Sequence, residues 1–128
     1  MFSVELNQPG NVLVIGYAGN VSPEEAHHCA LEVQAGLMGV QPGFRLLVDL
    51  TELESMEMAC SPVIGSIMEM CNAAGVAEVL RIIPDPTRDI GLQIMSFFHY
   101  GNNVYIRTCS SAAEAEEMLL MNPAVRLD

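Results

Sequence analysis

Alternating and β-branched hydrophobic positions open the chain. Residues 2–6 (FSVEL) alternate between apolar and polar side chains, and residues 12–17 (VLVIGY) are rich in β-branched ones. The turn-forming cluster Asn-Gln-Pro-Gly-Asn at residues 7–11 separates the two runs. Strand-like runs on either side of a turn predict a β-hairpin.

The hydrophobic period then changes to three and four residues, which is typical of a helix. Ser22 suits the N-cap, Pro23 the first helical position, and Glu25 the position that completes a capping box. The pattern predicts an amphipathic helix to about residue 38. Its apolar face consists of Ala26, Cys29, Ala30, Val33 and Leu37.

A nearly continuous apolar run at residues 44–50 (FRLLVDL) predicts a strand that is covered on both faces. We expect residues 51–60 to form a loop. A second helix is predicted to begin at Ser61 and Pro62, again as N-cap and first helical residue, and to end near Gly75. This helix is apolar almost all round, so we expect it to pack tightly against a sheet.

The same alternation continues to the C-terminus. Residues 78–83 (EVLRII) and 104–108 (VYIRT) predict strands, and a third helix is expected over about residues 87–100, with Thr87 or Asp85 as its cap. A capping box at Ser111 and Glu114 predicts a last helix to about residue 121.

The predicted order is β-β-α-β-α-β-α-β-α. Strands that alternate with helices imply right-handed crossovers and a mainly parallel sheet. The expected fold is therefore a single α/β domain over residues 1–128, in which a five-stranded, mostly parallel sheet with an N-terminal hairpin is covered by four helices.

Composition narrows the function. The 128 residues include 16 acidic and five basic side chains, all five of them arginine, for a formal charge of −11. This balance excludes nucleic acid as a partner and disfavours anionic membranes, because both need a cationic surface. No stretch reads as a membrane span. An apolar fraction of 51% excludes disorder.

Catalytic and metal-binding signals are weak. The four cysteines are far apart, and the opening sequence MFSVELNQPG does not read as a secretory leader, so we expect a reducing, cytoplasmic setting with buried thiols. His27, His28 and Cys29 diverge by about 100° per residue on a helix, so they do not predict a metal site. No cofactor motif occurs. We expect no enzymatic activity, although a thiol nucleophile with a lowered pKa stays open as an alternative.

The element order and three segments resemble the STAS domain family, which is named for sulphate transporters and anti-sigma factor antagonists. The segments are GNVLVIGYAGNVSPEEA, FRLLVDLTEL and ACSPVIGSIMEMC. In that family the third strand ends in Asp-Leu-(Ser/Thr), which Asp49-Leu50-Thr51 matches. The resemblance implies a regulatory protein-binding module with a phosphorylatable residue at the start of the second helix. Ser61 has that position, and Pro62 replaces the family's glycine.

Two interpretations of Ser61 remain. A phosphate on Ser61 would be stabilised by the helix N-terminus, but a serine there also serves simply as an N-cap.

The resemblance places the partner-binding surface on the segment before the second helix and on that helix. Clustered acids and methionines on these elements suit an adaptable surface for a regulatory protein with a basic face, and binding should weaken as salt rises. The sequence also leaves a homodimer as an alternative assembly. The predicted contact residues are Thr51, Glu54, Glu57, Met58, Ser61 and Met70.

A small-molecule anion sensor is the alternative function. Ligands of open α/β sheets bind beyond the carboxyl ends of the strands, where we expect Arg88 and Arg107 to lie near Thr51, Ser61 and Thr108. Against this, Arg88 has Asp85 and Asp89 as local pairing partners.

Overall fold

The computed structural model describes residues 1–83 and 104–120 of the chain. Within them the fold has five strands, three α-helices and one short 3₁₀ helix. The third helix expected from the sequence, about residues 87–100, lies outside the described residues. The elements are β1 (Phe2–Asn7), β2 (Val12–Val21), α1 (Pro23–Leu37), β3 (Arg45–Met56), η1 (Met58–Cys60), α2 (Ser61–Ala73), β4 (Glu78–Ile82), β5 (Tyr105–Cys109) and α4 (Ala112–Leu120).

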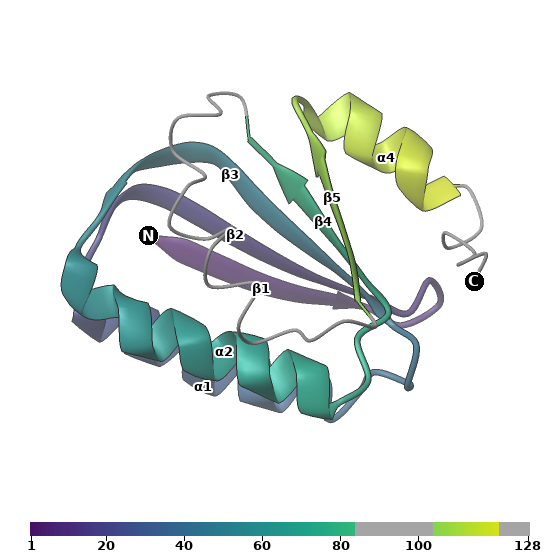
Figure 1. The fold of residues 1–128 in the computed structure, drawn as a ribbon, viewed down its shortest axis with the longest axis horizontal. Coiled ribbons are helices and arrows are strands. Elements are labelled where there is room, and N and C mark those ends of the chain that lie inside the picture. Colours follow the sequence, from purple (N-terminus) through teal and green to yellow (C-terminus); the bar gives the residue numbers. More distant parts are fainter. Residues whose placement is uncertain (84–103, 121–128) are drawn as a thin grey trace.

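The five strands form one mixed sheet in the order β1-β2-β3-β4-β5. β1 runs antiparallel to β2, as the predicted hairpin requires, and the pairs β2–β3, β3–β4 and β4–β5 are parallel. Helices α1 and α2 lie side by side on one face of the sheet, while α4 covers the β4–β5 end of the other face (Figure 1). The α/β class and the hairpin are therefore confirmed.

Local capping signals in the sequence placed two helix starts correctly. The Glu25 backbone N–H donates to Ser22 Oγ over 3.2 Å, and the Glu114 backbone N–H donates to Ser111 Oγ over 3.2 Å. The Glu114 carboxylate also reaches back and accepts from the Ser110 backbone N–H at 3.1 Å. These bonds satisfy N–H groups that have no partner within the helix.

The loop predicted for residues 51–60 is wrong. β3 continues to Met56 and pairs with β2, which itself runs on to Val21. Leu53 is buried, whereas Thr51, Glu52, Glu54 and Ser55 are exposed, and the β2–β3 register shifts twice in this stretch, so its burial does not follow strict strand alternation. Its polar composition suggests a loop, but pairing with residues 18–21 of β2 makes it a strand.

The N-cap role predicted for Ser61 is also wrong. η1 runs directly into α2, and Cys60, at φ −73° and ψ −20°, occupies the N-cap. Ser61 already has helical angles of φ −52° and ψ −49°. Pro62 is therefore the second residue of α2, where a missing N–H is still tolerated.

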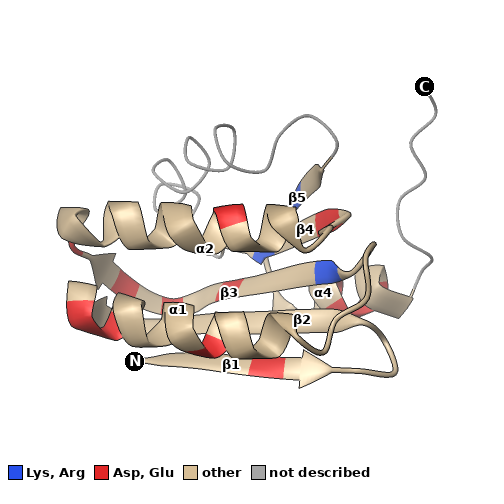
Figure 2. Cartoon of the chain, turned by 90° about the horizontal axis from the view of Figure 1, so that it is seen from below, with Lys and Arg blue, Asp and Glu red and all other residues tan. Residues whose placement is uncertain are grey.

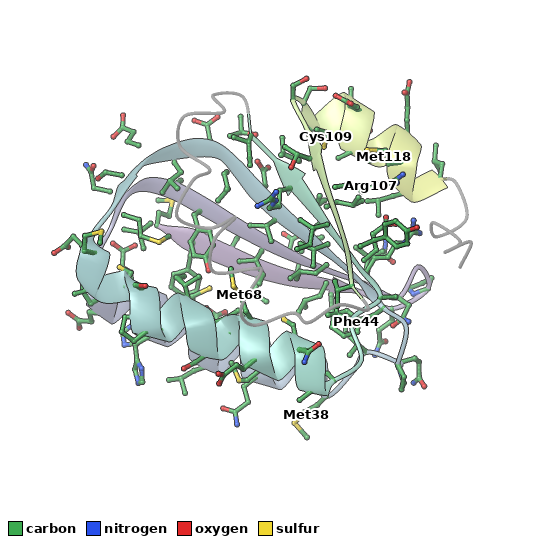
Figure 3. The ribbon with its side chains drawn as sticks, in the orientation of Figure 1. Met38, Phe44, Met68, Arg107, Cys109 and Met118 are labelled. Carbon is green, nitrogen blue, oxygen red and sulfur yellow. The ribbon has the colours of Figure 1, made fainter. Side chains whose placement is uncertain are left out.

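The main core lies between the sheet and the helices α1 and α2. The apolar face predicted for α1 is confirmed at Ala26, Cys29 and Val33, which are fully buried. Met68 points from α2 toward the sheet, and Phe44 fills the end of the core near the amino ends of the parallel strands (Figure 3). One continuous core holds β1–β4 and both helices together.

A smaller apolar cluster holds α4 on the opposite face. Ile82 and Cys109 pack there against Ala115. Beside this cluster the buried Arg45 donates through Nη2 to the carbonyl oxygen of Leu119 at 2.9 Å. A cation at the C-terminal end of a helix satisfies free carbonyls and opposes the helix dipole, so Arg45 anchors the end of α4.

Candidate functional site

Residues 51–61, here called the acidic segment, form the end of β3, η1 and the first residue of α2. Thr51, Glu54, Glu57 and Ser61 are exposed along it. Met58 is 89% exposed, which is unusual for a large apolar side chain. An exposed methionine therefore lies among exposed carboxylates, at the carboxyl end of the parallel strands.

The acidic segment is fixed to the end of β2 by three hydrogen bonds. Ser55 Oγ donates to Asn20 Oδ1 at 2.5 Å. The Glu57 backbone N–H and the Cys60 thiol both donate to the carbonyl oxygen of Val21, over 3.3 and 3.5 Å. Met58, between Glu57 and Cys60, is thus presented from a backbone anchored on both sides, which lowers the entropy lost when a partner binds.

Thr51 is hydrogen-bonded to Asp49, two residues earlier in β3. Its backbone N–H and its hydroxyl both donate to Asp49 Oδ1, at 2.9 and 2.5 Å. This arrangement fixes the Asp-Leu-Thr sequence in the middle of β3. Thr51 remains exposed, so its methyl group is available to a partner.

Met70, the last predicted contact residue, lies apart from the acidic segment. It is half-buried and lines a shallow groove of about 330 Å³ between α1 and α2. The sequence analysis missed this groove, although Leu31 gave a signal: it is apolar but falls off the core stripe of α1. The residues that form the groove with Met70 include Ala30, Leu31, Gln34, Val63 and Ser66.

The surface that carries α1 and α2 is acidic. Neither helix contains lysine or arginine, whereas α1 carries Glu24, Glu25 and Glu32 and α2 carries Glu69. In Figure 2 both helices show red positions and no blue ones. With Glu57 nearby on the acidic segment, this face has a negative potential that favours basic partners.

Arg107 does not lie with the acidic segment. Its Nη2 donates to Glu78 Oε1 at 3.4 Å, and its side chain belongs to the face of the sheet that α4 covers (Figure 3). Ser61 begins a helix on the opposite face. Thr108 points away from Arg107, because neighbouring strand residues alternate, and accepts from Arg81 Nη2 at 3.0 Å. Arg88 lies outside the described residues, so the predicted pairing of Arg88 with Arg107 stays a prediction.

All four cysteines are free and buried, as the sequence predicts. Burial raises the pKa of each thiol above its ordinary value, and it raises the pKa of Cys71 to about 12. The charge of Glu57 adds to the effect at Cys60, the cysteine next to the candidate surface. A nucleophilic thiol needs a lowered pKa and access to solvent, and these side chains have neither.

The free energy of unfolding should decrease as the pH rises above about 9. In the unfolded chain Cys71 ionises near its ordinary pKa of 9.0, whereas in the folded protein it stays protonated to about 12. Stability is therefore full below the unfolded pKa and is lost between the two values. Urea unfolding at about pH 7.5 to 10 measures this, and Cys71→Ala should show a shallower pH dependence. An equal slope in both proteins would contradict the assignment.

Neither a metal-binding cluster nor a membrane-spanning helix occurs among the residues that the structure describes. In the described part of the chain, no three His, Cys, Asp or Glu side chains are placed to hold a metal ion. His27 and His28 are exposed, while Cys29 is buried behind them. Among the described helices, none is long and apolar enough to cross a membrane.

The fold is similar to solved structures, although no family profile and no curated protein matches the chain. The anti-sigma factor antagonist SpoIIAA in its unphosphorylated form matches with a TM-score of 0.63 and 15% identity, over 94% of this chain and 98% of that one. The Bacillus cell fate determinant SpoIIAA in the phosphorylated form matches with a TM-score of 0.62 and 15% identity, over 93% and 99%.

A third similar structure is a Shewanella loihica protein of the DUF3478 family with a SpoIIAA-like fold. It matches with a TM-score of 0.69 and 16% identity, over 93% of this chain and 92% of that one. These likenesses extend over nearly the full length of each chain. The STAS-like fold expected from the sequence is therefore confirmed.

Proposed function

We propose that this protein is a non-enzymatic regulatory module that binds a partner protein through the acidic segment and α2. The observation that carries the proposal is Met58, which is 89% exposed on a backbone held by hydrogen bonds to Asn20 and Val21. An exposed apolar side chain on an anchored backbone is a suitable contact for a partner's pocket. Thr51, Glu54, Glu57 and Ser61 would surround this anchor, and Met70 would extend the surface along α2.

The fold supports the same conclusion. Two of the similar structures are those of an anti-sigma factor antagonist, once phosphorylated and once unphosphorylated. Since a shared fold hosts many functions, the argument depends on the surface as well. The exposed carboxylates Glu54 and Glu57 call for a regulatory partner that presents lysine or arginine around an apolar pocket.

Ser61 is the phosphoacceptor in this proposal. It is exposed, and it is the first residue of α2, where the positive end of the helix dipole would favour a phosphate. Glu57 lies four residues earlier, so an added phosphate would also raise the negative charge of the partner surface. Phosphosite mapping of the protein from its native cells tests this role. Phosphate on other residues but never on Ser61 would contradict it.

The binding surface is tested with matched variants in a quantitative pull-down. Met58→Asp places a charge in the proposed anchor and should reduce recovery of the specific partner about tenfold or more. Met38→Asp makes the same change at a side chain that is 88% exposed at the far end of α1 and should leave recovery unchanged. Equal recovery with both variants would sink the proposal.

The acidic contribution has its own pair of variants. Glu54→Lys with Glu57→Lys reverses the charge of the acidic segment, whereas Glu116→Lys with Glu117→Lys makes the same change on the exposed side of α4. Only the first pair should weaken binding and flatten its salt dependence. A similar loss from both pairs would mean that net charge, not this surface, governs association.

A further inference from the structure

The groove between α1 and α2 has apolar side chains that the protein does not use in its own core. Leu31 is 54% exposed, whereas its neighbours Cys29 and Val33 are fully buried. Val63 and Met70 approach it from α2 and leave a hollow of about 330 Å³. Exposed apolar side chains that gather in a groove indicate a binding surface.

The walls of the groove determine whether the backbone of its occupant is helical or extended. Both walls are α-helices that lie side by side, so their backbone N–H and C=O groups are bonded within each helix. An extended peptide would find no strand edge to pair with and would leave its own backbone groups unpaired. A helix satisfies its backbone internally and packs its side chains into the groove between two others.

The negative charge around the groove determines which side chains its occupant carries along its edges. Glu24 is one turn before the lining residue His27, and Glu69 is one turn after Ser66, so carboxylates border both walls. The arginines in the described part of the chain do not balance them, since Arg45 and Arg81 are buried in the sheet and Arg107 is on the opposite face. A second copy of this chain would bring its own acidic helices to the groove and be repelled.

We propose that the α1–α2 groove binds an amphipathic helix of the partner protein, with apolar residues in the groove and lysine or arginine along both flanks. The inference rests on the proposed function, because it assumes a protein partner, and it adds the partner's recognition element. Leu31 is the centre of the contact. The acidic segment would then engage the body of the partner beyond this helix.

A peptide of about four helical turns provides the probe. It carries leucine at i, i+3, i+4 and i+7 and lysine elsewhere, and its binding to the full chain is followed by fluorescence anisotropy. A glutamate version and a version with dispersed leucines are the control peptides. Only the lysine peptide with the leucine stripe should bind, and its affinity should fall between about 0.05 and 0.3 M salt.

Two variants of α1 separate the groove from general charge attraction. Leu31→Lys and His28→Lys each add one cationic side chain to an exposed position, but only Leu31 lines the groove. Leu31→Lys should weaken binding of the lysine peptide about tenfold or more, and His28→Lys should change it by less than about twofold. Both positions are exposed, so both variants should fold, which circular dichroism verifies.

The outcomes are distinct. Loss of binding in Leu31→Lys alone supports the inference. Equal losses in both variants, binding of the dispersed or glutamate peptide, or no binding at all would overturn it. A wild-type dimer that Leu31→Lys converts to a monomer would assign the groove to a second copy instead. Because Met58 is outside the groove lining, a partner lost by Met58→Asp but retained by Leu31→Lys would leave the proposed function intact and remove only the groove inference.

Discussion

Replacing Glu78 by glutamine is expected to lower the free energy of unfolding by about 3 kcal/mol. Glu78 is 1% exposed, receives a hydrogen bond from Arg107 at 3.4 Å, and is the direct register partner of the buried Arg45 on β3. The neutral amide has nearly the same shape but removes the charge that pairs with the Arg107 guanidinium. Breaking a buried ion pair from one side costs more than the pair itself contributes. Urea denaturation of both proteins measures the difference.

Glu116→Gln is the matched control for this prediction. Glu116 is exposed on α4, so the same chemical change should alter the unfolding free energy by less than about 0.5 kcal/mol. A double variant, Glu78→Leu with Arg107→Leu, should recover much of the loss, because two apolar residues leave no uncompensated charge. An effect of Glu78→Gln as mild as that of Glu116→Gln would show that the Glu78–Arg107 pair between β4 and β5 contributes little to stability.

Phe44→Ala is expected to destabilise the protein by a similar or larger amount, about 3–5 kcal/mol. Phe44 is the largest of the fully buried side chains, at 0% exposure, and it fills the core just before β3 begins. Alanine leaves a cavity that the rigid backbone cannot close, since the Phe44 carbonyl oxygen is fixed by the Ala77 backbone N–H at 2.9 Å. Unfolding followed by circular dichroism measures the loss.

Two further variants test whether the loss at Phe44 comes from volume. Phe44→Leu keeps most of the apolar volume and should cost only about 1–1.5 kcal/mol. Met38→Ala removes a large side chain that points into solvent from the end of α1 (Figure 3) and should have little effect. Equal losses from Phe44→Ala and Phe44→Leu would indicate a lost shape-specific contact rather than a cavity.

Sequence reasoning succeeded where the signal was local. Ser22 and Ser111 cap their helices as predicted, because an N-cap bond joins residues only three positions apart. It failed at Ser61, where an equally good Ser-Pro signal was overridden. There Glu57 and Cys60 donate hydrogen bonds to the Val21 carbonyl oxygen, and these bonds hold η1 against the end of β2. The chain is therefore already helical at Met58, one turn before Ser61.

At the candidate surface, too, local sequence signals were reliable and long-range placement was not. Met58, one of the contact residues predicted from the sequence, is 89% exposed. The grouping of Arg107 with Ser61 did not follow, since the face to which a strand residue points depends on register. Leu31 lies outside the apolar face predicted for α1 and lines a groove only because α2 lies beside α1.

The sequence by itself determined the α/β class, the N-terminal hairpin, two helix caps, the burial of the cysteines and the acidic character of the chain. Each of these depends on short-range spacing or on composition. Only the tertiary structure decided that β3 runs to Met56, that Glu78 joins Arg107 across the sheet, and that α1 and α2 enclose a groove. These features connect residues far apart in the chain, and their free energies depend on burial and register, which no local pattern specifies.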